Sequence, residues 1–352
     1  MNDWGYLDTL GAWDEAADMP EQLARAHEAA RRCAHAAGYA ALAPPRGVVA
    51  FGQGTGALAA DAAAALVTAS LPVPFAVVRA AEVPAYVDEH TLVLALSAAG
   101  EADEVVAAAG VAAGRGAALV GVGPAVAASS LGRTVRDSQR ADTLWCPFDP
   151  VRTPRGGLAA ATVSVLAVLA ECGLVPDPAA SVAGAATALA RRRDAWMTPG
   201  SAPELLARHL GRTIPLVYGA VGVAAVAAQW WKAGVNLNAK APAFAASVPS
   251  LTYDELAGWG QGGDVTRQTM SLVFLRHDGE PAEAAPLFAR VRADTEEIMA
   301  NLFDVRAEGE DDLGRFFDFA LLGELVSLHL AGREGVDPGP APAVDESHPV
   351  AS

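Results

Sequence analysis

A glycine-rich segment follows the first apolar run of the chain, and its residue types suit the binding of an anion. Residues 48–51 read as a short strand, then come Gly52, Gly54 and Thr55, and an alanine-rich stretch continues to Val67. In the order strand, glycine loop, helix, free backbone N–H groups and the helix dipole both favour negative charge. Such turns also occur only for close packing, so the segment predicts either a phosphate-binding loop or a packing turn.

A second candidate for an anion site begins at Ser97, directly after the apolar run 91–96. Ser97 and Gly100 offer a hydroxyl and a backbone N–H, and Arg155 farther along the chain offers a cation. Both Ser97 and Arg155 also have plain structural interpretations, as a strand-end serine and a surface cation. Glu101 brings a carboxylate to the expected start of a helix, where it competes for the N–H groups and repels an anion. We therefore expect Glu101 to limit anion binding, and Glu101→Asn combined with Ala99→Ser and Ala102→Thr to strengthen it.

The elements that position these residues alternate between short apolar runs and helical stretches. This alternation predicts parallel β-sheets flanked by helices, an α/β fold. Residues 216–222 repeat residues 49–55 with an aromatic residue and a glycine in register. We therefore expect two related doubly wound parallel-sheet domains in tandem. Proline and glycine breaks near residue 200 set the expected limits: an N-terminal domain with its flanking helices at 1–198, a C-terminal domain at 199–335 and a flexible tail at 336–352.

Composition excludes several classes of function. Hydrophobic residues make up 52% of the chain, and 25 Lys and Arg against 41 Asp and Glu leave a net charge of −16, which disfavours nucleic acids and anionic membranes as partners. The uncharged segment Thr213–Trp231 contains Pro215 and Gly219, so we interpret it as a buried strand, turn and helix rather than a membrane span. Three cysteines without metal-ligand spacing and an N-terminus without a secretion signal favour the cytoplasm, and we expect neither a metal nor a cofactor.

Five fragments, taken in their order along the chain, resemble the bifunctional phosphoglucose/phosphomannose isomerases. That resemblance implies two tandem SIS (sugar isomerase) domains, a homodimer and a sugar phosphate as ligand. We expect Trp230 and Trp231 in the core or in a dimer contact, to which they offer apolar surface, rather than in a sugar platform. The fragments are Val83-Pro84-Ala85-Tyr86-Val87-Asp88-Glu89-His90-Thr91-Leu92-Val93, Trp231-Lys232 with Asn236-Leu237-Asn238-Ala239-Lys240, Leu256-Ala257-Gly258-Trp259, Leu275-Arg276-His277-Asp278 and Gly335-Val336-Asp337-Pro338.

The family implies a base, an acid and a lysine that this chain lacks. Isomerisation moves a proton between C1 and C2 of the sugar, which needs a base, and ring opening needs an acid. Leu237 stands where the family has the glutamate base, Tyr253 stands at the histidine, and His348 lies nearest to the C-terminal lysine. The phosphate loop also departs from the family, with alanine at positions 99 and 102 and glycine at position 56 where hydroxyls are expected.

Two interpretations follow from these departures. We favour a carbohydrate-derivative (phosphosugar) binding protein that has lost catalysis, since a missing base alone typically costs a factor of 10²–10⁴. The alternative is an active aldose–ketose isomerase that has rebuilt its site from Asp254, Glu255, Lys240 and His348. It would interconvert glucose 6-phosphate or mannose 6-phosphate with fructose 6-phosphate.

Overall fold

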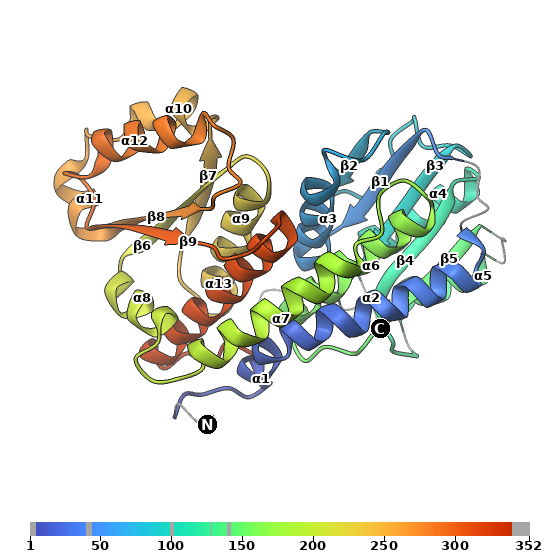
Figure 1. Cartoon of the computed structure of the whole chain (residues 1–352), viewed down its shortest axis with the longest axis horizontal. Coiled ribbons are helices and arrows are strands. Elements are labelled where there is room, and N and C mark those ends of the chain that lie inside the picture. Colours follow the sequence, from blue (N-terminus) through green and yellow to red (C-terminus); the bar gives the residue numbers. More distant parts are fainter. Residues whose placement is uncertain (1–4, 40–43, 99–101, 128, 139–141, 340–352) are drawn as a thin grey trace, which may run out of the picture. The chain divides into compact units, whose positions relative to one another are not determined.

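The computed structural model describes residues 5–39, 44–98, 102–127, 129–138 and 142–339. The chain forms two compact units, one of Asp18–Ala190 and one of Met1–Ala17 with Arg191–Ser352. Each unit has its own parallel sheet with helices on both faces (Figure 1). The predicted α/β class with two parallel-sheet domains is confirmed.

The sheet of the first unit, Asp18–Ala190, has the strand order β2-β1-β3-β4-β5 in the described part of the chain, and all neighbours are parallel. The central strands are almost fully buried, which explains why their sequences are continuous apolar runs. The strands are β1 (Gly47–Gly52), β2 (Phe75–Val78), β3 (Thr91–Leu96), β4 (Ala118–Pro124) and β5 (Thr143–Phe148).

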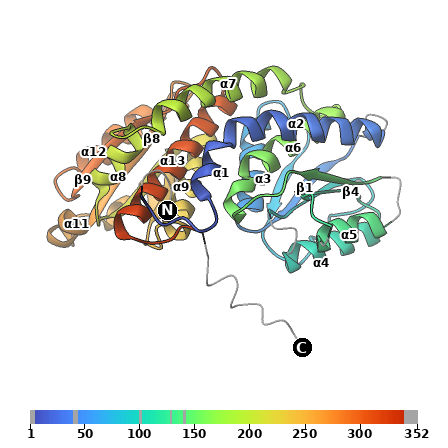
Figure 2. The same ribbon diagram turned by 90° about the horizontal axis from the view of Figure 1, so that it is seen from below.

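Helices cover both faces of this sheet. Figure 2 shows α2, α3 and α6 on one face and α4 and α5 on the other. The second face buries a core in which Phe51 and Val93 of the sheet meet Val105 of α4 and Val135 of α5. The helices are α2 (Met19–Ala36), α3 (Gly54–Val67), α4 (Asp103–Gly114), α5 (Ser130–Asp137), the 3-10 helix η2 (Pro154–Gly157), α6 (Leu158–Glu171) and α7 (Ala179–Trp196).

The second unit has a parallel sheet of order β7-β6-β8-β9 among the described residues. Its strands are β6 (Ile214–Ala220), β7 (Phe244–Val248), β8 (Met270–Arg276) and β9 (Asn301–Arg306). Its helices are α1 (Ala12–Ala17), α8 (Ala202–Leu210), α9 (Val223–Leu237), α10 (Leu251–Asp254), the 3-10 helix η3 (Leu256–Gly258), α11 (Gly263–Thr269), α12 (Ala284–Thr295) and α13 (Asp312–Glu334).

The uncharged segment Thr213–Trp231 forms β6, a glycine turn and most of α9, as predicted. No helix in the described ranges is both long and apolar enough to cross a bilayer. Trp230 and Trp231 are 1% and 2% exposed, and their indole N–H groups donate to carbonyls of α13 at 3.1 and 2.8 Å. They belong to the core of the second unit, so the expectation that they offer surface to a partner is wrong.

The compact units do not follow the expected domain limits. Residues before Asp18 group with the second sheet, and the other division falls after Ala190, inside α7. The N-terminal segment is held there because the rings of Tyr6 and Trp13 pack against His329 of α13, with centroids 6.1 and 4.8 Å away. Limits at 198 and 335 as folding domains stay a prediction, and the tail from residue 340 lies outside the described residues.

Candidate functional site

The carboxyl edge of the first sheet brings the glycine segment to a topological switch point. In a sheet of order 2-1-3-4-5 the connections leave β1 and β3 toward opposite faces, and ligands bind outside the carboxyl ends of these two strands. Gly52 ends β1, Gln53 precedes α3 in an extended conformation, and Gly54 has φ +48°. Thr55 is 8% exposed in the first turn of α3. The segment therefore lies where a ligand of this fold is expected.

Two glycines of this segment are needed for packing. A Cβ on Gly52 would lie 2.6 Å from the backbone nitrogen of Ala57, and a Cβ on Gly56 would lie 2.6 Å from the carbonyl oxygen of Leu96. Gly56 therefore leaves no room for the serine that the family resemblance implies at this position. Thr55 is the hydroxyl that this loop retains.

Ser97 directly follows β3, the second of the two strands that flank the switch point, and is 5% exposed. Its Oγ accepts a long hydrogen bond of 3.4 Å from the backbone N–H of Ala102, just before α4 begins. A hydroxyl at this place can serve both the helix start and an anion, because it carries two acceptor lone pairs and one donor. Gly100 and Glu101, together with Ala99, lie outside the described residues.

Arg155 sits in η2, between β5 and α6, and is 4% exposed. Thr153 begins this turn, and its side chain accepts from the N–H of Gly156 at 3.3 Å. The turn packs on the end of β3, since a Cβ on Gly157 would lie 3.2 Å from Cβ of Ala98. Among the described residues, no other lysine or arginine is buried. The Arg155 guanidinium is always charged, so it brings positive charge to the end of the sheet that η2 packs on.

In the second unit, side-chain hydrogen bonds order the turn that ends α9. Asn236 Nδ2 donates to the carbonyl of Ala241 at 2.8 Å, and Asn238 Nδ2 donates at 2.8 Å to both Glu324 and Ser327 of α13. Lys240 has φ +53° and its Nζ donates to the carbonyl of Leu237, which closes the helix. Burial lowers the pKa of Lys240, against the attraction of Asp337.

Leu237 differs from its neighbours in this turn, because its side chain is 37% exposed. The aliphatic group is thus presented at the surface of the second unit, at the position where the family resemblance implies the base. Leucine cannot accept a proton, so the turn offers the place for a base without the base itself.

Tyr253, at the position expected for the histidine, and the proposed substitutes Asp254 and Glu255 differ in their surroundings. Tyr253 is 86% exposed, and Asp254 beside it is exposed as well. Glu255 accepts a hydrogen bond from the hydroxyl of Tyr218, a residue of β6 that is 1% exposed. Burial and the Glu255 carboxylate raise the pKa of Tyr218. Glu255 thus has a structural partner, and His348 lies outside the described residues.

His277 is a candidate that sequence reasoning left without a role. It directly follows β8, next to the switch point between β6 and β8, and is 7% exposed. Its Nδ1 accepts from the backbone N–H of Gly279 at 3.2 Å, and burial lowers its pKa, which favours neutral imidazole with the proton on Nε2. The signal in the sequence was the same as for Ser97: a polar residue at the end of a buried apolar run. Among the described residues, no group of His, Cys, Asp and Glu could hold a metal ion.

Comparison with known proteins finds similar sequences along most of the chain. Residues 201–348 match the model of the bacterial phospho-glucose isomerase C-terminal SIS domain. The chain is 25% identical over 305 residues to a bifunctional phosphoglucose/phosphomannose isomerase of Caldicellulosiruptor bescii, covering 85% of this chain and 87% of that protein. A protein of the same description from Aquifex aeolicus is 26% identical over 313 residues, covering 86% and 90%.

Solved structures agree on the fold. The tagatose-6-phosphate ketose/aldose isomerase of Escherichia coli has a TM-score of 0.71 at 15% identity, covering 97% of both chains. The C-terminal domain of glucosamine-fructose-6-phosphate aminotransferase from Francisella tularensis has a TM-score of 0.68 at 15% identity, covering 96% of this chain and 99% of that one. The chain thus has two parallel-sheet units and a C-terminal segment that matches an SIS domain, and it is similar along most of its length to two bifunctional phosphoglucose/phosphomannose isomerases.

Proposed function

We propose that this protein binds a phosphosugar or a related carbohydrate derivative and does not interconvert aldose and ketose phosphates. The observation that carries the proposal is the turn at the end of α9. Asn236, Asn238 and Lys240 keep their structural contacts there, while exposed Leu237 occupies the position of the base. The scaffold of a catalytic turn without its proton acceptor supports binding without catalysis.

Ligand binding belongs at the carboxyl edge of the first sheet. Buried Arg155 supplies positive charge, and Thr55 and Ser97 supply hydroxyls on the two strands that flank the switch point. A charge-assisted hydrogen bond from an arginine contributes about 1.5–3 kcal/mol, or roughly a 10- to 100-fold change in affinity.

Calorimetry with glucose 6-phosphate, mannose 6-phosphate and fructose 6-phosphate tests this placement. We expect Arg155→Met to weaken binding of the tightest of these ligands at least about 10-fold. Arg152→Met is the matched control, because Arg152 lies three residues away and is exposed. Equal binding by both variants would move the ligand away from this edge.

A coupled assay of sugar-phosphate interconversion tests the loss of catalysis. Turnover by the parent above about 1 s⁻¹, within the ordinary range of enzymes, would favour the alternative of a rebuilt isomerase site. Two of the residues that this alternative would use already have hydrogen-bond partners. Glu255 accepts from the hydroxyl of Tyr218, and Lys240 donates to the carbonyl of Leu237.

Restoring the base gives the sharper form of this assay. In a Tyr253→His background, we expect Leu237→Glu to raise the rate at least about 100-fold over Leu237→Gln, because only the glutamate accepts a proton. The two variants have nearly the same size, so packing does not distinguish them. Equal rates would show that position 237 is not the site of a lost base.

We also propose a cytoplasmic homodimer. The family resemblance favours the dimer, the three free cysteines fit a reducing compartment, and the second unit exposes apolar side chains. Val221 is 58% exposed and Val265 is 63% exposed. Light scattering at micromolar concentration should give twice the mass of the chain, and a monomer would contradict the dimer.

A further inference from the structure

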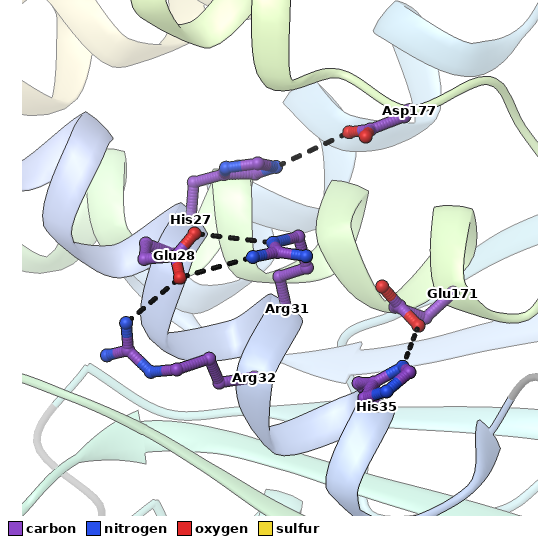
Figure 3. Close-up of polar contacts among 7 residues, drawn as sticks. All are labelled: His27, Glu28, Arg31, Arg32, His35, Glu171 and Asp177. Carbon is purple, nitrogen blue, oxygen red and sulfur yellow. Dashed lines mark hydrogen bonds and ion pairs between the residues drawn. The ribbon is translucent and has the colours of Figure 1, made fainter.

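Three basic side chains form a row along α2 at intervals of four residues: His27, Arg31 and His35 (Figure 3). Residues four apart lie on one face of a helix, so this row faces one neighbouring segment. The segment is the connection from α6 to α7. His27 Nε2 lies 4.0 Å from Oδ1 of Asp177, and His35 Nδ1 lies 3.6 Å from Oε2 of Glu171.

Both carboxylates also mark the ends of helices. Glu171 is the last residue of α6, and Asp177 Oδ1 accepts from the backbone N–H of Ala179 at 2.9 Å, where α7 begins. The two histidines of α2 therefore face the end of one helix and the start of the next. We name this contact, formed by His27, His35, Glu171 and Asp177, the α2 junction.

The two histidines differ in their access to water. The side chain of His27 is 7% exposed, whereas that of His35 is 80% exposed. Within the described residues, Nε2 of His27 is buried without a hydrogen-bond partner. At 4.0 Å, Asp177 lies beyond hydrogen-bond distance, so a proton on His27 would carry its charge into a buried place without a direct acceptor.

Charged groups act on His27 from both sides of the junction. Asp177 attracts the charged imidazole from the α6–α7 connection, Glu28 attracts it from α2, and Arg31 on α2 repels it. Arg31 is itself paired with Glu28 at 3.3 Å, which offsets part of its charge. Burial outweighs these attractions and lowers the pKa of His27.

We propose that His27 makes the α2 junction sensitive to acid: the neutral imidazole packs in the closed junction, and its protonation favours an open one. In the open form the imidazole is hydrated and regains its ordinary pKa of about 6.5. Since the closed form binds the proton more weakly, a fall in pH below that value shifts the equilibrium toward opening. His35 is too exposed to have this effect. The inference is independent of the ligand proposed above.

Hydrogen exchange of the backbone amides between Glu171 and Ala179, measured by mass spectrometry from pH 7.5 to pH 5, tests the proposal. After correction for the intrinsic exchange rate, we expect opening of the parent to increase roughly 10-fold over this range, with an upper limit of about 30-fold set by the ordinary pKa. His27→Gln should abolish the dependence, and the matched His35→Gln should keep it. A dependence that survives His27→Gln, or that His35→Gln removes, overturns the proposal.

A second variant acts through the carboxylate and keeps the imidazole. Asp177→Asn preserves the cap of α7, since asparagine is as good a capping residue as aspartate. It removes the attraction that holds a proton on His27 in the closed junction, so the acid-induced opening should become steeper. An unchanged or shallower profile would contradict the role of His27, and this result does not depend on the stability of His27→Gln.

Discussion

The two units build the same junction between strand and helix and then use it differently. A Cβ on Gly52 would lie 2.6 Å from the backbone of Ala57, and a Cβ on Gly219 would lie 2.3 Å from the backbone of Ala224, five residues ahead in both cases. The first junction stands beside a buried arginine and a serine, whereas the second stands beside exposed Val221 and buried His277. The backbone repeat is thus a requirement of packing, while the chemistry depends on side chains that the fold leaves free to change.

The largest effect should come from filling these junctions. We expect Gly52→Ala and Gly219→Ala each to lower the free energy of unfolding by about 3 kcal/mol or more, since the new methyl group meets backbone atoms that cannot turn away. Urea denaturation measures the change. Gly184→Ala in α7 is the control: nothing lies within 4 Å of its added Cβ, and alanine should stabilise the helix by about 0.5–1 kcal/mol. Small losses at both junctions would mean that the shared packing is not a constraint.

Strands were predicted from continuous apolar runs in the sequence, so strands without such a run were missed. Continuous apolar runs in the sequence predict the central strands β1, β3, β4, β6 and β8, and also the edge strand β2. The missed strands β5, β7 and β9 all lie at sheet edges. An edge strand is paired on one side and partly exposed, so it carries residues such as Pro147 in β5 and Asp304 in β9. Their positions are set by the neighbouring strand, which the local sequence does not contain.

The candidate site was predicted unevenly for a similar reason. The glycine segment and Ser97 could be located because each follows a buried strand, and parallel strands end at a common edge. The burial of Arg155 and the contact between Tyr218 and Glu255 depend on residues distant in sequence, so no local pattern indicates them. The roles of Glu101 and His348 stay predictions. A lost base at Leu237 is implied by the resemblance and stays a prediction, and the structure adds the hydrogen bonds of Asn236 and Asn238 that order this turn.

The second unit should be more sensitive to acid than the first, because it buries both His277 and His329, whereas the first unit buries His27. His329 in α13 is 0% exposed, and burial lowers its pKa to about 4, against the attraction of Glu204. The unfolded chain therefore takes up the proton first as the pH falls from about 6.5 to about 4. The stability that neutral His329 provides is complete above about pH 6.5 and is lost across that window, by up to about 3 kcal/mol.

Urea denaturation at pH 7 and at pH 4.5 measures this loss. His329→Leu should make the free energy of unfolding less dependent on pH than in the parent, whereas a change at exposed His90 to Gln should leave the dependence as it is. If His329→Leu retains the full dependence, the acid sensitivity belongs to other groups, and the buried histidine does not distinguish the second unit.

The smallest effect separates Tyr218 from Tyr253 in the second unit. Tyr218→Phe removes the hydroxyl that donates to Glu255 and leaves a partly buried carboxylate without that donor, so the free energy of unfolding should fall by about 1–2 kcal/mol. Tyr253→Phe should change it by less than about 0.5 kcal/mol, because the side chain is 86% exposed. It should also leave sugar-phosphate binding unchanged if the ligand lies at the first sheet. A loss of binding in Tyr253→Phe, measured by calorimetry, would instead make this exposed tyrosine part of the ligand site. The ligand would then not be bound by the first unit alone, and the proposed difference between the two units would be wrong.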